Sequence, residues 1–334
     1  MASTEQPVVG WIGLGGMGMA MARNIHKFLH REGRSPLRYW NRTASRGAPL
    51  ESLGGIGCET ITQLVVECDL IFISLYRVLE LTLNPEMSDD AALIGIVDQI
   101  LSVEDIDGKI IVDTTTVHAN TTKQVNEKLE SRGANLIAAP VFGATPAAES
   151  GTVLMGMAGP KAAIEVVSPF VKDVLAREVM VVSEQPEKAS LLKTLGNFIV
   201  AGTMEIIGEA QVLAEKSELG TDTLEKLLEL NFGSLMHSTS TRMTQGVYLP
   251  GKGESPWSSL ELGIKDVQHG VTSARDAGMR LKVAEVALEN MERAKRFADA
   301  HGGRSLDSSS GYGIIRQDAG LGFENTFVKE RDSI

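Results

Sequence analysis

The sequence predicts an α/β chain in which a domain built on a parallel sheet is followed by an all-helical domain. In the first half, short apolar runs alternate with helical patterns, which is typical of βαβ units. The runs are apolar on consecutive residues, as in strands that helices cover on both faces. After residue 183 the apolar residues recur at spacings of three and four, which indicates helices. With 334 residues the chain is long enough for two cores.

Each predicted element can be placed along the chain. A proline-free segment in the second half, about 45 Å long as a helix, could join the two domains. We expect a first domain at 1–184, a second at 185–317, and a polar segment at 318–334 that forms a mobile tail or an arm on a partner subunit. The predicted strands are 8–12, 37–40, 70–75, 110–113, 135–141, 152–157 and 179–182, and the predicted helices of the second half are 188–217, 223–230, 260–277 and 281–300.

Composition and charge exclude several classes of function. The formal net charge of -11, without clustered Lys and Arg, argues against a nucleic-acid surface. The two cysteines, Cys58 and Cys68, form no CxxC pair, so we expect neither disulfides nor a metal site. No signal-peptide pattern opens the chain, and no apolar run approaches the ~20 residues of a membrane span. We therefore expect a cytoplasmic protein in a reducing compartment.

A glycine-rich turn follows the first predicted strand. It fits the GxGxxG pattern in the required context of strand, turn and helix, because the apolar residues that follow recur every four positions. Its glycines permit a tight turn and let a pyrophosphate approach the backbone at a helix N-terminus. The alternative is a turn that binds nothing, but the context favours a Rossmann-type dinucleotide site. The residues assigned to it are Gly13, Leu14, Gly15, Gly16, Met17 and Gly18.

The end of the second predicted strand indicates which dinucleotide binds. NAD enzymes usually carry an acidic residue there to accept hydrogen bonds from the ribose hydroxyls. Here Asn41 removes that charge, while Arg42 and Thr43 could bind a 2′-phosphate, with Arg46 as a second cation. The sequence therefore favours NADP, the alternative being that Arg42 is a solvated surface residue.

Residues 9–18, with Met21 and Asn24, resemble the N-terminal signature of the β-hydroxyacid dehydrogenases. That family includes 3-hydroxyisobutyrate dehydrogenase and the glyoxylate and succinic semialdehyde reductases. The resemblance extends over residues 8–316, and three further motifs occur in the family's order. It implies a Rossmann domain, a helical domain and an oxidoreductase that acts on hydroxy or carbonyl compounds.

The second motif is the run of threonines after Asp113, which is similar to the family's Asp-x-Ser-Thr. The resemblance assigns Thr115 to the substrate and Thr116 to the cofactor. Leu75 and Tyr76, after the third predicted strand, are also assigned to the cofactor, although many relatives have proline at the second position. Without the family, three threonines after a strand would more often form a turn or a helix cap.

The third motif, at 139–144, is similar to the family's Ala-Pro-Val-Ser-Gly-Gly substrate loop. Phe142, Gly143 and Ala144 take the substrate-binding positions by resemblance. Phe142 stands where the family has serine, and Ala144 where it has glycine, so this loop is bulkier and more apolar. That departure puts a small 3-hydroxy acid in doubt and suggests a larger or less polar carbonyl compound.

The fourth motif includes Lys193 and Asn197, which lie one helical turn apart and can converge on one substrate oxygen. By resemblance, Lys193 is the catalytic general acid and base, Asn197 is its hydrogen-bonding partner, and both contact substrate. A lysine in such a position would otherwise be a snorkelling surface residue. In a later helix, Lys265 is assigned to the cofactor by resemblance, with a solvated Lys265–Asp266 pair as the alternative.

These assignments predict NADPH-dependent reduction of an aldehyde, semialdehyde or keto acid, or the reverse oxidation, with a small molecule as substrate and a homodimer or homotetramer as the assembly. An imine reductase or reductive aminase is one competing hypothesis, favoured by the apolar Phe142 but not by Lys193. A non-catalytic oligomeric module of the same fold is another, against which the retention of Lys193 and Asn197 argues. A 6-phosphogluconate dehydrogenase is a third hypothesis, but it would need a longer helical domain and a basic phosphate pocket, which we do not expect from this sequence.

Overall fold

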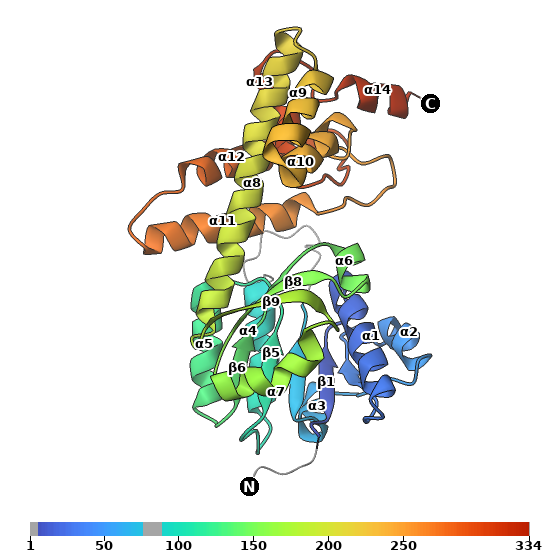
Figure 1. Cartoon of the computed structure of the whole chain (residues 1–334), viewed down its shortest axis with the longest axis vertical. Helices are drawn as coiled ribbons and strands as arrows, with labels where there is room; N and C mark the ends of the chain where they lie inside the picture. The colour runs from blue at the N-terminus through green and yellow to red at the C-terminus, as the bar shows by residue number, and fades with distance from the viewer. Residues whose placement is uncertain (1–5, 76–88, 334) are drawn as a thin grey trace. The chain divides into compact units, whose positions relative to one another are not determined.

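The computed structural model of the chain describes residues 6–75 and 89–333. The chain divides into two compact units, Met1–Lys193 and Thr194–Ile334, which we describe one at a time. The long helix α8 (Glu187–Lys216) begins in the first unit and continues into the second (Figure 1). The sequence predicted a domain boundary after residue 184, three residues before this helix begins. The exact boundary between the domains stays a prediction.

The first unit contains a sheet whose strands run in the spatial order β3-β2-β1-β4-β5-β6-β8-β7, with β9 paired to β8. The first six strands in sequence pair in parallel, as predicted for five of them, whereas the short strand β3 was not predicted. Their register brings the carboxyl ends of β1, β4 and β5 to one edge, where the loops with the predicted site residues emerge. The bounds are β1 Val9–Ile12, β2 Arg38–Trp40, β3 Ile56–Gly57, β4 Leu70–Ile73, β5 Ile110–Asp113 and β6 Asn135–Ala138.

The last three strands make the sheet mixed, a feature that the predicted parallel sheet did not include. Strand β8 (Val153–Ala158) runs antiparallel to β6 and to β7 (Val141–Phe142), while β9 (Ala176–Ser183) is parallel to β8. The reason is the short connection between β7 and β8, which contains only the five-residue helix α6 (Thr145–Glu149). A parallel pair needs a crossover of a dozen or more residues.

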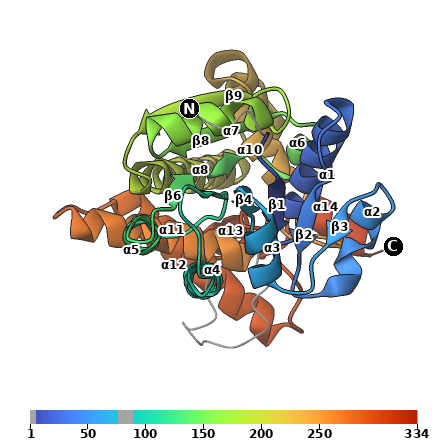
Figure 2. The ribbon, with the colours of Figure 1, turned by 90° about the horizontal axis from the view of Figure 1, so that it is seen from below.

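Helices cover both faces of the sheet, as the apolar strands predicted (Figures 1 and 2). One face packs against α1 (Gly16–Arg31) and α7 (Lys161–Val171). The other packs against α3 (Ile61–Glu67), α4 (Asp89–Leu101) and α5 (Ala119–Glu130). Alternate residues of each strand enter the two cores, so that Trp11 stacks on Phe72 in the first core while Ile12 and Ile71 belong to the second. A short 3-10 turn (Ala44–Gly47) and α2 (Ala48–Glu51) follow β2.

The second unit is helical, as predicted, and has a core of its own. A buried carboxylate organises it: Asp307 accepts two hydrogen bonds from the Arg242 guanidinium, at 2.8 and 2.6 Å, and one from the Ser258 backbone at 3.0 Å. The helices after α8 are α9 Thr221–Leu227, which continues as a π-helical turn over Leu228–Phe232, α10 Ser234–Thr244, α11 Leu260–Asp276, α12 Lys282–Ala300, α13 Gly311–Asp318 and α14 Thr326–Asp332.

The segment 318–334 is not the unpatterned tail that the sequence suggested. It contains α14, capped by the Asn325 side chain, which accepts a hydrogen bond from the Val328 backbone at 2.9 Å. Val328 and Phe323 are buried in the core of the helical unit. The Tyr248 hydroxyl donates to the Phe323 carbonyl and accepts from the Asn325 backbone. These contacts fold the segment onto its own unit.

The apolar content of α8 corrects one expectation from the sequence. By length and composition alone this helix could cross a membrane, whereas we expected no apolar segment of that extent. The core helix of a helical domain meets the same criteria, and residues of α8 such as Ala201, Ile207 and Val212 belong to the core of the second unit. Length and composition therefore do not distinguish a core helix from a membrane-spanning helix at α8.

Candidate active site

The glycine loop joins β1 to α1 and has the geometry of a phosphate cradle. Gly13 has a φ of 97°, and a Cβ there would lie 2.3 Å from the Ser74 carbonyl oxygen, so only glycine fits. Helix α1 begins at Gly16 without a side-chain cap and without an acidic residue in its first turn. Its first N–H groups and the positive end of its dipole are therefore open to an anion. Leu14 and Met17 face the core at either end of the turn.

The residues at the end of β2 have two different surroundings: Asn41 is hydrogen-bonded to the glycine loop, and the residues after it are exposed. Asn41 accepts a hydrogen bond from the Leu14 backbone at 2.8 Å and donates to the Thr43 carbonyl at 2.7 Å, which ties β2 to the glycine loop. Arg42, Thr43 and Arg46 are exposed. Neither arginine forms an ion pair within residues 6–75 and 89–333. Two cations are therefore available beside the cradle.

The loops after β4 and β5 are joined by hydrogen bonds. The Thr115 hydroxyl accepts from the Leu75 backbone at 3.2 Å, and the Thr115 backbone donates to Asp113 at 3.0 Å. Thr115 is buried, whereas Thr116 and Leu75 are half-buried at the carboxyl edge of the sheet. Tyr76, the residue next to Leu75, lies outside the described residues.

Asp113 is a buried acid that the sequence analysis left without a role. Burial raises the pKa of its carboxyl to about 7, although hydrogen bonds from Thr115 act in the opposite direction. The carboxylates of Asp90 and Asp89 raise that pKa further. Asp113 therefore braces the threonine loop from beneath the sheet edge, and its hydrogen-bond acceptor strength changes near neutral pH.

The predicted substrate loop lies next to the glycine loop. A Cβ on Gly16 would lie 3.6 Å from the Thr145 hydroxyl at the start of α6. The Asn24 side chain, on α1, donates to the Ala148 carbonyl at 2.8 Å and so holds the end of α6. Asn24 belongs to the N-terminal signature, and this contact gives it a structural role. Phe142 ends β7, and the exposed Gly143 and Ala144 lead from it into α6.

Lys193 is held by the first turns of α8, which pack closely on the first unit. Ala189 packs with Ala138 of β6 and Ala158 of β8, and such small side chains let the helix approach the strands. One residue later, the Ser190 hydroxyl is 2.7 Å from the Thr122 hydroxyl of α5 in a buried hydrogen bond. The half-buried Lys193 follows, and its Nζ lies 4.8 Å from the centroid of the Phe142 ring. The structure thus brings Lys193 to the substrate loop.

The predicted site residues of the helical unit form a second group. The Asn197 amide donates to the Asp266 carboxylate at 2.8 Å. The Lys265 ammonium lies 3.3 Å from the other oxygen of that carboxylate. All three side chains are half-buried. Asp266 fixes which way the amide of Asn197 points, so the amide oxygen is directed away from the carboxylate.

Comparisons with known proteins decide the family. A model described as the NAD binding domain of 6-phosphogluconate dehydrogenase matches residues 8–183. A second, described as the NAD-binding of NADP-dependent 3-hydroxyisobutyrate dehydrogenase, matches residues 188–314. The chain belongs to the β-hydroxyacid dehydrogenase family. It is therefore an NAD(P)-dependent oxidoreductase of hydroxy and carbonyl compounds with a nicotinamide coenzyme, and the glycine cradle described above fits such a coenzyme.

Individual relatives agree with the family over most of the chain. A protein named NADH-dependent oxidoreductase ucdB, from Aspergillus ustus, is 29% identical over 311 residues, which are 92% of this chain and 98% of that protein. Glyoxylate/succinic semialdehyde reductase 1 of Arabidopsis thaliana is 29% identical over 296 residues, 86% of this chain and 92% of the relative. The solved 3-hydroxyisobutyrate dehydrogenase of Mycobacterium tuberculosis, with L-serine, is 19% identical, with a TM-score of 0.76 over 93% of this chain and 100% of the other, and it shares the fold.

Two acids that contact the predicted site residues of this β-hydroxyacid dehydrogenase were given no role from the sequence. Asp113 precedes the predicted threonines and Asp266 follows Lys265, so both stand inside quoted motifs. Their signal was an acidic residue at a position that the pattern predicts to be buried or helical. The sequence did not reveal which groups donate hydrogen bonds to these acids. Asp113 accepts from the Thr115 backbone, two residues away, and Asp266 accepts from Asn197, 69 residues away.

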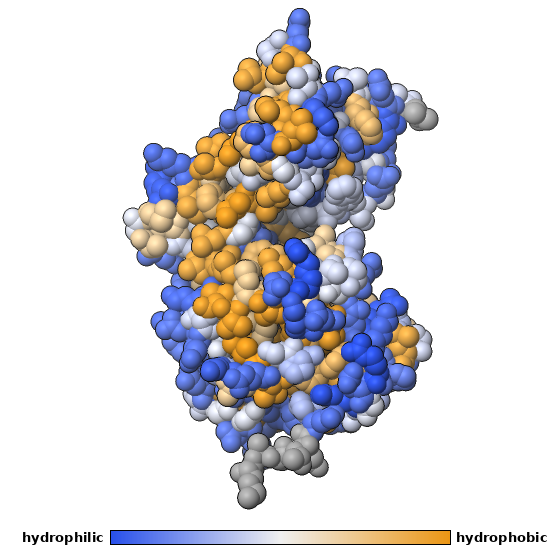
Figure 3. Space-filling model, in the orientation of Figure 1, coloured by the Kyte–Doolittle hydropathy of each residue, from blue (hydrophilic) through white to orange (hydrophobic). Residues whose placement is uncertain are grey.

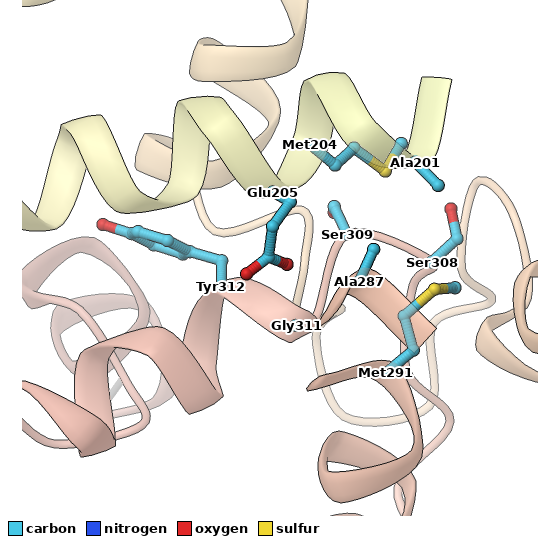
Figure 4. A pocket seen from close by; sticks show the side chains of 9 residues that line it. All are labelled: Ala201, Met204, Glu205, Ala287, Met291, Ser308, Ser309, Gly311 and Tyr312. Atoms are coloured by element: carbon cyan, nitrogen blue, oxygen red, sulfur yellow. The ribbon is translucent and has the colours of Figure 1, made fainter. Parts of the chain in front are cut away.

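A small cavity in the helical unit lies among residues that were not predicted. Its space of about 10 Å³ is close to that of one water molecule. Glu205 points from α8 into it, as Figure 4 shows, and accepts a hydrogen bond from Asn290 at 2.6 Å. Burial raises the pKa of Glu205 to about 6. The cavity is lined by Ala201, Met204, Glu205, Ala287, Met291, Ser308, Ser309, Gly311 and Tyr312.

Proposed function

We propose that this β-hydroxyacid dehydrogenase reduces an aldehyde or ketone to the alcohol with NADPH, and that Lys193 donates the proton. One observation carries the proposal: the ammonium group of Lys193 lies at the substrate loop, near the Phe142 ring, on a helix start that Ala189 anchors to the sheet and Ser190 anchors to α5. A lysine fixed in this way is placed for acid-base work and differs from a solvated surface lysine.

The proton chemistry assigns distinct roles to the residues. The nicotinamide coenzyme, when bound in the glycine cradle, supplies the hydride chemistry. The Lys193 ammonium stabilises negative charge on the carbonyl oxygen and delivers the proton to it. Asn197, held by Asp266, can donate or accept a hydrogen bond but cannot carry the proton. Thr115, Thr116 and Lys265 are proposed to position substrate and coenzyme.

The preference for NADP rests on the residues at the end of β2. The exposed Arg42 and Arg46, without ion-pair partners among the described residues, can bind a 2′-phosphate, and no acidic side chain ends that strand. A relative of similar length is named as NADH-dependent, so the coenzyme must be measured directly. We expect kcat/KM with NADPH to exceed that with NADH by about tenfold or more. A preference for NADH would overturn this part of the proposal.

The reaction class is tested with a panel of aldehydes, keto acids and cyclic imines, followed by NADPH consumption. The proposal expects turnover of carbonyl compounds without added amine. Turnover of a cyclic imine alone would instead support an imine reductase, the hypothesis that the apolar Phe142 favours. If no member of the panel is reduced although NADPH binds, the non-catalytic module becomes the better hypothesis.

We also propose a homodimer or homotetramer, formed through the helical unit in the cytoplasm. Ile199, Ile206 and Leu213 are each more than half exposed and recur every seven residues along α8, so they form one apolar stripe. Figure 3 shows apolar residues gathered on the face of the helical unit that carries α8. A second copy of the chain is the proposed occupant, because most oligomers of soluble proteins are symmetric homo-oligomers. The free thiols of Cys58 and Cys68 suit a reducing compartment.

A further inference from the structure

The contact between Phe142 and Lys193 is formed by a residue that departs from its family. The Lys193 Nζ lies 4.8 Å from the ring centroid of Phe142, within the range of a cation–π interaction. The family's loop has a serine at this position, as the sequence analysis noted. The departure therefore places an aromatic face, instead of a hydroxyl, against the proposed proton donor.

The ring is held in place by the sheet beneath it. Phe142 pairs with Leu154 across β7 and β8, which fixes the backbone from which the ring projects. A Cβ on Gly156, two residues along β8 from Leu154 and on the same face of the strand, would lie 4.0 Å from the edge of the ring and 3.3 Å from Leu192 on α8. Gly156 thus leaves room for both side chains. The Phe142 ring and the Lys193 ammonium are therefore positioned by neighbouring contacts within the first unit.

We propose that Phe142 determines the substrate class: its ring holds the Lys193 ammonium and forms an apolar wall, so that the enzyme reduces uncharged, apolar carbonyl compounds and disfavours those with a carboxylate. This inference rests on the proposed function of Lys193 as proton donor. It goes beyond that function because a proton donor alone places no limit on the charge of the substrate.

Electrostatics supports an uncharged substrate at this loop. Residues 139–147 contain no Lys, Arg or His, and Thr145 has the only side-chain hydroxyl among them. A carboxylate at Phe142 would lose water without gaining a side-chain hydrogen-bond donor from that residue, because a ring stands where the family has a hydroxyl, and the face of an aromatic ring carries negative potential. It would also compete with the carbonyl oxygen for the Lys193 charge. An alkyl chain, by contrast, gains from contact with the ring.

The test compares two aldehydes of equal chain length, butanal and succinic semialdehyde, which differ in that the second carries a carboxylate. Initial rates of NADPH consumption by the full chain would give kcat/KM for each. We expect the value for butanal to be at least about tenfold higher, the size expected from one unpaired charge. Equal values, or a preference for succinic semialdehyde, would overturn the inference while leaving the proposed function intact. If no carbonyl compound is reduced, the proposed function itself fails.

Variants of Phe142 separate the apolar wall from the cation–π contact. Phe142→Ser should lower the ratio of butanal to succinic semialdehyde by about tenfold, whereas Phe142→Leu, which stays apolar, should keep it. Phe142→Leu should nevertheless shift the alkaline limb of the pH–rate profile to lower pH by about half a unit, because the ring that stabilises the ammonium is lost. Phe142→Tyr should retain the wild-type profile.

Unchanged NADPH affinity, measured by fluorescence titration, would show that each variant is folded. An unchanged substrate ratio in a folded Phe142→Ser variant would contradict the apolar wall. An alkaline limb that does not move in Phe142→Leu would contradict the stabilisation of the ammonium by the ring.

Discussion

The two units of this protein differ in how many large apolar side chains they leave exposed. Of the twenty-two large apolar side chains that are exposed among the described residues, seven lie in the first unit and fifteen in the shorter second unit. The sheet of the first unit is covered on both faces by helices of the same unit, so its apolar strands are buried without a partner chain. The helical unit has a core but also a long apolar stripe. This difference supports the proposal that the second unit also forms the interface between subunits.

The largest expected effect tests the chemistry assigned to the first unit. Lys193→Ala should lower turnover by about 10² to 10⁴ while NADPH affinity changes little, because an acid-base group is lost but the glycine loop is not. Steady-state kinetics and fluorescence titration of NADPH would measure both. Thr122→Ala, which removes the buried partner of Ser190, should reduce turnover less, since it loosens the helix start without removing the amine. Full activity of Lys193→Ala would exclude the proposed role.

The coenzyme surface of the first unit should show the next largest effect. Arg42→Asp should weaken NADPH binding by about 10- to 100-fold, because a charge-assisted hydrogen bond to the phosphate is replaced by repulsion. NADH affinity should change much less. Arg177→Asp is a matched control, because that arginine is also exposed and lies on β9, a strand to which no coenzyme-binding residue is assigned. Equal weakening of both coenzymes would argue against a 2′-phosphate site.

The pH dependence of the free energy of unfolding should reveal the buried acids of both units, Asp113 in the first and Glu205 in the second. The folded-state pKa of Asp113 is raised to about 7 and that of Glu205 to about 6. In each case the folded state binds more protons than the unfolded state between the ordinary carboxyl pKa and the raised one. Both groups therefore make stability fall as pH rises through that window.

Asp113→Asn should remove about 2 kcal/mol of the stability difference between pH 5 and pH 7, and Glu205→Gln about half as much. Both substitutions keep a hydrogen-bond acceptor. Urea unfolding followed by tryptophan fluorescence reports mainly the first unit, which contains Trp11 buried against Phe72, and circular dichroism at 222 nm reports the helices of both units. A pH dependence that neither substitution alters would contradict the burial effect.

The smallest expected effect concerns assembly. Leu213→Asp, on the apolar stripe of α8, should weaken self-association by about tenfold, since a charge would be buried in the proposed interface. Val66→Asp is the matched control in the first unit, because Val66 and Leu213 are 67% and 68% exposed. Light scattering over a concentration series would show the shift. Equal effects of the two substitutions would remove the distinction between the units.

The two units also differ in how far their structure could be predicted from the sequence. Strand β5 was predicted with its observed bounds, and the glycine loop with its neighbours, because apolar periodicity and turn residues act locally. The antiparallel direction of β8 depends on a pairing partner that local pattern does not encode. Helix α14 was missed because it has seven residues, too few for a clear period, and is held by distant contacts to Tyr248.

In the candidate site, residue types could be predicted but contacts could not. Lys193 and Phe142 were both assigned from motifs, yet their contact joins residues 51 positions apart and depends on β7 pairing with β8. Asp266 was quoted in a motif without a role, since its bond to Asn197 exists only when α8 and α11 are folded. The roles carried over from the family stay predictions until they are measured.

The central claim is that an amine at position 193 supplies the proton, and chemical rescue tests it most directly. Turnover of Lys193→Ala would be measured with NADPH and a good aldehyde substrate at increasing concentrations of methylamine and ethylamine, with the wild-type protein as control. The account predicts a saturable recovery of turnover in the variant, absent from the wild type, that depends on the protonated fraction of the amine. Wild-type turnover by Lys193→Ala without any added amine would contradict it.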